Sequence, residues 1–153
     1  MNKWIIGARP RTLSAAITPV VAATALAYHQ NKSINWINVV LALLVGISLQ
    51  VGVNYSNDYS DGIKGSDNNR VGPIRLVGSG LATPKQVKSA AIFTFFVGAI
   101  FGTVLSLRTN WILLAIGVIA LLAAWFYTGG RTPYGYRSLG ELSVFIFFGI
   151  VAT

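Results

Sequence analysis

Three oxygen-bearing side chains recur at helical spacing in the first half of the chain, at Asn54, Asp58 and Asp61. At about 100° per residue, Asp58 would lie about 40° from Asn54, and Asp61 about 20° from it on the other side. Two carboxylates and an amide oxygen on one face suit Mg²⁺, whose coordination is usually completed by waters and substrate phosphates. We therefore predict Asn54, Asp58 and Asp61 as metal ligands and the two aspartates as catalytic. A solvated helix end whose acids pair with nearby cations is the alternative.

A glycine-rich stretch with three basic residues follows, at Lys64, Arg70 and Arg75. Ammonium and guanidinium groups bind phosphate oxygens, and arginine can do so with two parallel hydrogen bonds. Acidic metal ligands and basic phosphate donors in one segment fit a metal–diphosphate site. We predict that the three cations bind substrate, although such residues also occur wherever a membrane protein faces the cytoplasm.

The composition places these residues in a membrane protein. Charged residues make up 10% of the 153 positions and hydrophobic residues 54%, whereas soluble domains carry about 25% charged residues. Four stretches of roughly the 20 residues needed to cross a bilayer contain no charge. We predict an all-α, multi-span transmembrane bundle with helices near 12–29, 35–54, 87–107 and 110–127 and a fifth beginning near 139.

The basic residues also predict an orientation. Of the 12 Lys and Arg residues, all but Lys32 and Arg108 lie in the N-terminus, in the connection 55–86 with its helix junction, or in the connection 128–138. Cytoplasmic loops carry such an excess of Lys and Arg. These three segments are therefore expected on the cytoplasmic side, together with the candidate site.

Several classes of function are excluded or disfavoured. The chain has no cysteine and one histidine, which rules out thiolate metal ligands, a cysteine nucleophile and a three-histidine zinc site. The net charge of +8 is confined to loops rather than spread over a solvated basic face, so no nucleic-acid partner is expected.

Four stretches in a fixed order carry a family resemblance, at residues 8–19, 54–67, 72–81 and 127–141. The second resembles the first aspartate-rich motif of the UbiA-type intramembrane prenyltransferases. Together the four are similar to the branch that prenylates 1,4-dihydroxy-2-naphthoate to give demethylmenaquinone. The resemblance implies that residues 1–153 are the N-terminal part of a single UbiA-like domain of about nine spans, in a bacterial plasma membrane.

The resemblance also implies substrates and a cofactor. The expected partners are a polyprenyl diphosphate, 1,4-dihydroxy-2-naphthoate and the lipid bilayer, and the expected cofactor is Mg²⁺. Tyr127 and Arg131 match a Tyr-x3-Lys element near the family's active site, with arginine in place of lysine. Tyr127 is therefore expected to be catalytic and Arg131 to bind substrate.

Three expectations remain open to test. The family's second aspartate motif is absent from residues 1–153, so this segment alone is expected to be inactive. Another aromatic acceptor, such as 4-hydroxybenzoate, is the alternative within the family. A non-enzymatic membrane transporter or scaffold fragment, with the acids as ion ligands, is the alternative outside it.

Overall fold

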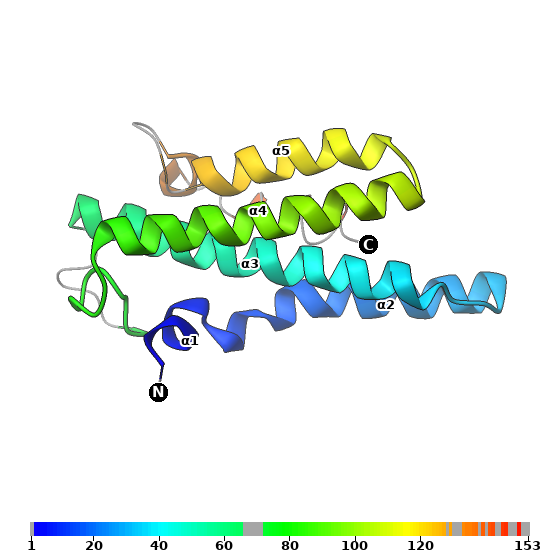
Figure 1. The fold of residues 1–153 in the computed structure, drawn as a ribbon, viewed down its shortest axis with the longest axis horizontal. Helices are drawn as coiled ribbons and strands as arrows, with labels where there is room; N and C mark the ends of the chain where they lie inside the picture. Colours follow the sequence, from blue (N-terminus) through cyan, green and yellow to red (C-terminus); the bar gives the residue numbers. More distant parts are fainter. Residues whose placement is uncertain are drawn as a thin grey trace.

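The chain folds as a bundle of helices that run side by side (Figure 1). The computed structural model describes residues 2–65 and 72–127 and, further on, residues 129, 133–137, 139, 141–142, 145–146 and 150. Every regular element within this part of the chain is helical. In order they are α1 (Lys3–Ala8), η1 (Pro10–Thr12), α2 (Ser14–Asn31), α3 (Trp36–Lys64), α4 (Pro84–Arg108), α5 (Ile112–Phe126) and η2 (Tyr134–Arg137).

Four of the five predicted helices are present as α2, α3, α4 and α5, with α3 extended, and one short helix is added. α3 begins after an N-cap at Asn35 and continues ten residues beyond the expected end, to Lys64. It stops there because Gly65 adopts a left-handed conformation (φ 71°), which glycine tolerates without strain. The predicted connection 55–86 is therefore too long, since residues 55–64 are helical. The short helix α1 was not predicted.

Two helices, α3 and α4, are each long and apolar enough to cross a membrane. The segment Lys3–Thr12 and α2 would count as a third span if taken together, although they are bent by 46° relative to each other. α5 has 15 residues, or about 22 Å, against about 30 Å of hydrocarbon. The expected fifth helix near residue 139 lies largely outside the described residues.

α3 and α4 form the most extensive helix pair in the bundle. Their close approach depends on small residues, because a Cβ at Gly52 would lie 2.6 Å from the ring of Phe95. α4 begins with a capping box in which Thr83 and Gln86 exchange hydrogen bonds, followed by Pro84 at the first turn. Both features define a helix start.

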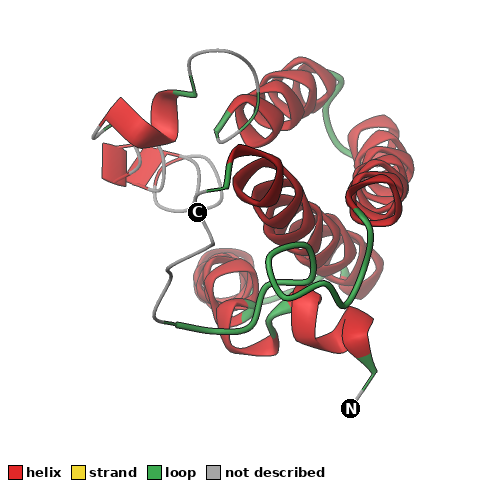
Figure 2. Ribbon diagram, turned by 90° about the vertical axis from the view of Figure 1, so that its left-hand side faces the viewer, coloured by secondary structure: helices red, strands yellow, loops and turns green. Residues whose placement is uncertain are grey.

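The helices alternate in direction, so the segments that carry most of the basic residues gather at one end of the bundle (Figure 1). Seen from that end, the turn before α4 crosses the helix ends beside α1 (Figure 2). The buried apolar cluster also lies here and joins α3, this turn and α4. It consists of Tyr55, Leu76, Ala82, Val87 and Ala91.

Candidate functional site

The candidate site is built on the last three turns of α3. The helix has 29 residues, or about 44 Å, which exceeds the hydrocarbon thickness by about 14 Å. Most of its polar residues lie in the last three turns, from Asn54 to Lys64. Asn54, Asp58 and Asp61 are all buried, and buried polar groups almost always have hydrogen-bond partners. Each of these three side chains has a different hydrogen-bond partner.

Asn54 binds the N-terminal segment. Its amide Nδ2 donates to the carbonyl oxygen of Ala8 at 2.8 Å and to Oγ1 of Thr12 at 2.9 Å. Between these two residues, Arg9 ends α1 with a left-handed backbone conformation (φ 51°). The Thr12 hydroxyl in turn donates to the carbonyl of Arg9 at 2.9 Å. Asn54 therefore stabilises the bend that separates α1 from η1.

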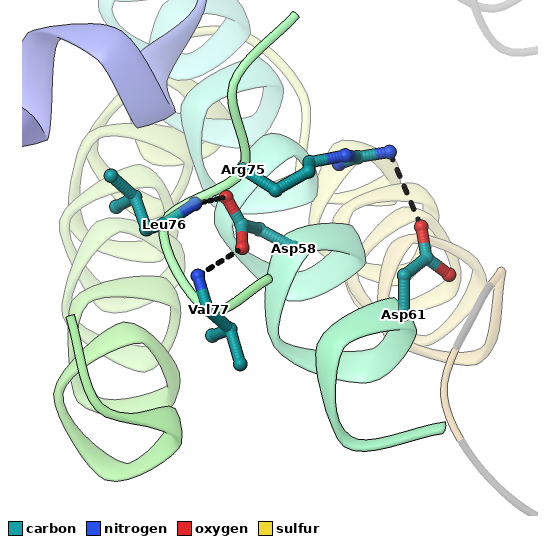
Figure 3. Close-up of polar contacts among 5 residues, drawn as sticks. All are labelled: Asp58, Asp61, Arg75, Leu76 and Val77. Atoms are coloured by element: carbon teal, nitrogen blue, oxygen red, sulfur yellow. Dashed lines mark hydrogen bonds and ion pairs between the residues drawn. The ribbon is translucent and has the colours of Figure 1, made fainter. Parts of the chain in front are cut away.

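Asp58 binds the turn before α4 (Figure 3). Its Oδ2 accepts a hydrogen bond from the backbone N–H of Leu76 at 2.8 Å, and its Oδ1 accepts one from the N–H of Val77 at 3.0 Å. The side chain has 0% of its surface exposed. The carboxylate thus compensates its burial with two charge-assisted hydrogen bonds.

Asp61 binds a side chain of the same turn. Its Oδ2 lies 3.2 Å from Nη2 of Arg75, and the two side chains are 8% and 7% exposed (Figure 3). Such a buried pair is expensive to break by removing one partner, because the remaining charge loses its compensation. The arrangement shows that this carboxylate is held against positive charge.

The other predicted site residues are more scattered. Lys64 is exposed at the end of α3. Tyr127 follows α5 at the same end of the bundle, with its ring edge-to-face against Tyr134 at 5.4 Å between centroids. Arg70 and Arg131 lie outside the described residues.

Sequence reasoning missed the groups that organise the site. Tyr55 donates its hydroxyl to the carbonyl of Trp4 at 2.7 Å, and the two rings pack edge to face. The backbone N–H groups of Leu76 and Val77 were also missed. No side-chain pattern predicts a backbone donor, but the turn-forming sequence around these residues indicates where one could be offered.

The structure shows no assembled metal site at the three predicted ligands, because each of them already has protein partners. Within the described parts of the chain, no group of three or more His, Cys, Asp or Glu residues could hold a metal ion. Both oxygens of Asp58 accept backbone N–H groups, and the Nδ2 of Asn54 donates to Ala8 and Thr12. Asp61 fits a metal better, because its Oδ2 pairs with the side chain of Arg75 rather than with a backbone donor and its side chain is 8% exposed.

An open cavity of about 460 Å³ lies elsewhere, between α1 and the start of α4. None of the predicted site residues lines it, so we assign it no part in the chemistry. Its lining residues are Trp4, Lys85, Gln86, Ser89, Ala90 and Phe93.

Comparison with known proteins finds a family model and curated relatives that agree with each other. The model of the UbiA prenyltransferase family matches residues 16–153. A 1,4-dihydroxy-2-naphthoate octaprenyltransferase of Mycobacterium tuberculosis is 54% identical over 150 residues, which cover 98% of this chain and 51% of that protein. The Escherichia coli protein of the same name is 37% identical over 153 residues, covering 95% and 49%.

More distant relatives are found in vertebrates. A UbiA prenyltransferase domain-containing protein 1 of Xenopus tropicalis is 27% identical over 152 residues, which cover 97% of this chain and 44% of that protein. The chain therefore spans about half the length of the curated relatives it matches. No solved structure gives a significant match.

Proposed function

Because the chain belongs to the UbiA prenyltransferase family, we propose that it forms the N-terminal part of a membrane enzyme that prenylates 1,4-dihydroxy-2-naphthoate. The donor is a polyprenyl diphosphate and the product is demethylmenaquinone. The observation that carries this proposal is the 54% identity to a naphthoate octaprenyltransferase along 98% of the chain. It favours the naphthoate over 4-hydroxybenzoate as the acceptor.

The proposal includes a topology. The bent segment with α2, then α3, α4 and α5, are four spans, and a fifth begins near residue 139 of a nine-span domain in the bacterial plasma membrane. Because α5 has 15 helical residues, local thinning of the bilayer or additional residues at its ends would have to complete the crossing. The basic end of the bundle, and with it the N-terminus and the candidate site, faces the cytoplasm. Support comes from the gathering of basic segments at this end and from the bias of cytoplasmic loops toward Lys and Arg.

The diphosphate of the donor binds at the end of α3. Arg75 and Lys64 donate hydrogen bonds to its oxygens, and so do Arg70 and Arg131, which lie outside the described residues. Arg75 is prepared for this role because Asp61 already holds its guanidinium. Cations placed where the leaving group gains charge lower the barrier, since the allylic C–O bond breaks with its electron pair on the diphosphate.

Asp61 is the described residue that would hold Mg²⁺, together with diphosphate oxygens. When bound, the ion supplies further neutralisation of the leaving group. Tyr127, at the same end of the bundle, faces the acceptor side of the site in this proposal. The aromatic ring of the acceptor then forms the new carbon–carbon bond to the prenyl group as the diphosphate leaves, and the ring loses the carboxylate of the acceptor as CO₂, which gives the hydroquinone form of demethylmenaquinone.

The test uses the complete polypeptide that contains this chain, reconstituted in nanodiscs. With a polyprenyl diphosphate, 1,4-dihydroxy-2-naphthoate and Mg²⁺, we expect demethylmenaquinone, and we expect its formation to stop in EDTA. An Asp61→Asn variant of equal yield is the matched control. Product with 4-hydroxybenzoate alone would contradict the acceptor, and no prenyl transfer to either acceptor would contradict the proposed activity.

A further inference from the structure

The carboxylate of Asp58 joins two segments that are 18 residues apart in the chain. Each oxygen accepts one backbone N–H, from Leu76 at 2.8 Å and from Val77 at 3.0 Å (Figure 3). Consecutive backbone N–H groups that converge on one anion form an anion-binding site. In phosphate-binding proteins the anion is a ligand, but here it is a side chain of the protein itself.

The turn that donates these bonds is firmly seated. Leu76 has 0% of its surface exposed, and its side chain packs so closely on α1 that a Cβ at Gly7 would lie 2.6 Å from it. The turn is also closed internally, by Ser79 N–H to the carbonyl of Arg75 and by Ala82 N–H to the carbonyl of Leu76, both at 3.0 Å. It therefore behaves as one unit, which Asp58 attaches to α3.

Arg75 directly precedes the two anchored residues. Its guanidinium reaches Asp61, which is less than one helical turn beyond Asp58 on α3. The backbone of Arg75 is therefore placed by the Asp58 hydrogen bonds and its side chain by Asp61. Loss of the Asp58 anchor would release the backbone from which this arginine extends.

A metal ion at Asp58 would have to share both carboxylate oxygens with the backbone donors that they already accept. Any N–H group that it displaced would lose its partner in a buried or part-buried position, at a free-energy cost that protein interiors generally avoid. The side chain also has no exposed surface through which an ion could approach.

We propose that Asp58 is a positioning residue, which anchors Leu76 and Val77 and so holds Arg75 toward the diphosphate, and that it is not a metal ligand. This inference rests on the proposed function for the identity of the diphosphate. The anchor itself does not depend on it. Asp61 and Asp58 thus have different roles although they share one helical face.

The experiment compares Asp58→Asn with Asp61→Asn in the complete polypeptide in nanodiscs. Hydrogen exchange is read at the amides of Leu76 and Val77, and the Mg²⁺ concentration for half-maximal transfer is read beside the KM for prenyl diphosphate. For Asp58→Asn we expect exchange to quicken by about tenfold or more and KM to rise by about tenfold, with the Mg²⁺ midpoint unchanged. For Asp61→Asn we expect the Mg²⁺ midpoint to rise and the two amides to stay protected.

A second measurement needs no variant. In the wild-type protein, the amides of Leu76 and Val77 should remain equally protected in Mg²⁺ and in EDTA. Protection that depends on the metal, or an Asp58→Asn variant with a raised Mg²⁺ midpoint and undisturbed amides, would overturn the proposal. The exchange data are independent of turnover, so a wild-type protein without prenyl transfer would count against the proposed function and leave the anchor intact.

Discussion

Gly62 of α3 lies so close to Val77 that a Cβ at this glycine would come within 2.4 Å of Val77 Cγ1. Gly62 is one helical turn beyond Asp58, whose Oδ1 accepts the N–H of the same valine. The anchored turn therefore needs two features of α3: a hydrogen-bond acceptor at Asp58 and a glycine at position 62 that leaves room for Val77. Each requirement can be tested separately.

The Gly62→Ala substitution is expected to loosen the turn. Alanine favours a helix over glycine by about 1 kcal/mol, but overpacking against Val77 should cost about 1–3 kcal/mol. Exchange of the Leu76 and Val77 amides should quicken and prenyl transfer should fall. Gly117→Ala in α5 is the matched control, because a Cβ there meets nothing within 4 Å. Equal behaviour of the two variants would contradict the close contact.

Asn54→Ala is expected to destabilise the bend at the N-terminus. It removes two hydrogen bonds, to Ala8 and Thr12, and leaves a part-buried carbonyl without this donor, at a cost of about 1 kcal/mol or more. Thermal unfolding in detergent measures the loss. A double-mutant cycle with Thr12→Val should give clearly less than additive effects, because the two residues share one hydrogen bond. Additive losses would show that the pair is not coupled.

Arg75→Lys should raise the KM for prenyl diphosphate more than it lowers kcat. Lysine keeps the charge but lacks the planar fork that can bind Asp61 and a phosphate oxygen together. Steady-state kinetics at saturating Mg²⁺ provide the measurement. Lys85→Arg, at an exposed position at the start of α4, is the control, because it exchanges the same two residue types in the opposite direction. Unchanged KM for Arg75→Lys would remove this residue from the diphosphate site.

The orientation can be tested by labelling single cysteines, because residues 1–153 contain no cysteine. A membrane-impermeant maleimide applied to intact cells should label Lys32→Cys. It should label Lys85→Cys only after the membrane is permeabilised, since the basic end of the bundle is expected inside. Labelling of both positions, or the reverse pattern, would contradict the proposed topology.

Residues 1–153 expressed alone are expected to be inactive. The chain spans about half of its curated relatives, and Asp61 is the one described carboxylate that we propose as a metal ligand, whereas a diphosphate carries several negative charges. Prenyl transfer by this segment is compared with that of the complete polypeptide in the same nanodiscs. Turnover within about tenfold, or about 1.4 kcal/mol in barrier height, would show that nothing beyond residue 153 is required.

The sequence alone was sufficient to predict the helical class and the approximate position of each long helix. Charge-free stretches of bilayer length have few alternatives to a helix, because every backbone polar group in lipid must be satisfied within the segment. The sequence motifs also led to the family, which the match over residues 16–153 confirms. The end of α3 at Lys64 was harder to predict, because residues 55–64 are polar and helix formation there depends on packing against α1 and the turn.

The roles of the individual site residues depended on the tertiary structure. Helical periodicity correctly places Asn54, Asp58 and Asp61 on one face of α3. It carries no information about which groups of the protein each side chain contacts. The structure brings the α1 bend to Asn54, two backbone N–H groups to Asp58 and a guanidinium to Asp61. These partners come from segments distant in sequence, and three of them are backbone groups, the carbonyl of Ala8 and the N–H groups of Leu76 and Val77, which side-chain patterns do not distinguish. For that reason composition and spacing predict a polar site here, and only the packed chain decides which carboxylate meets backbone donors and which meets a guanidinium.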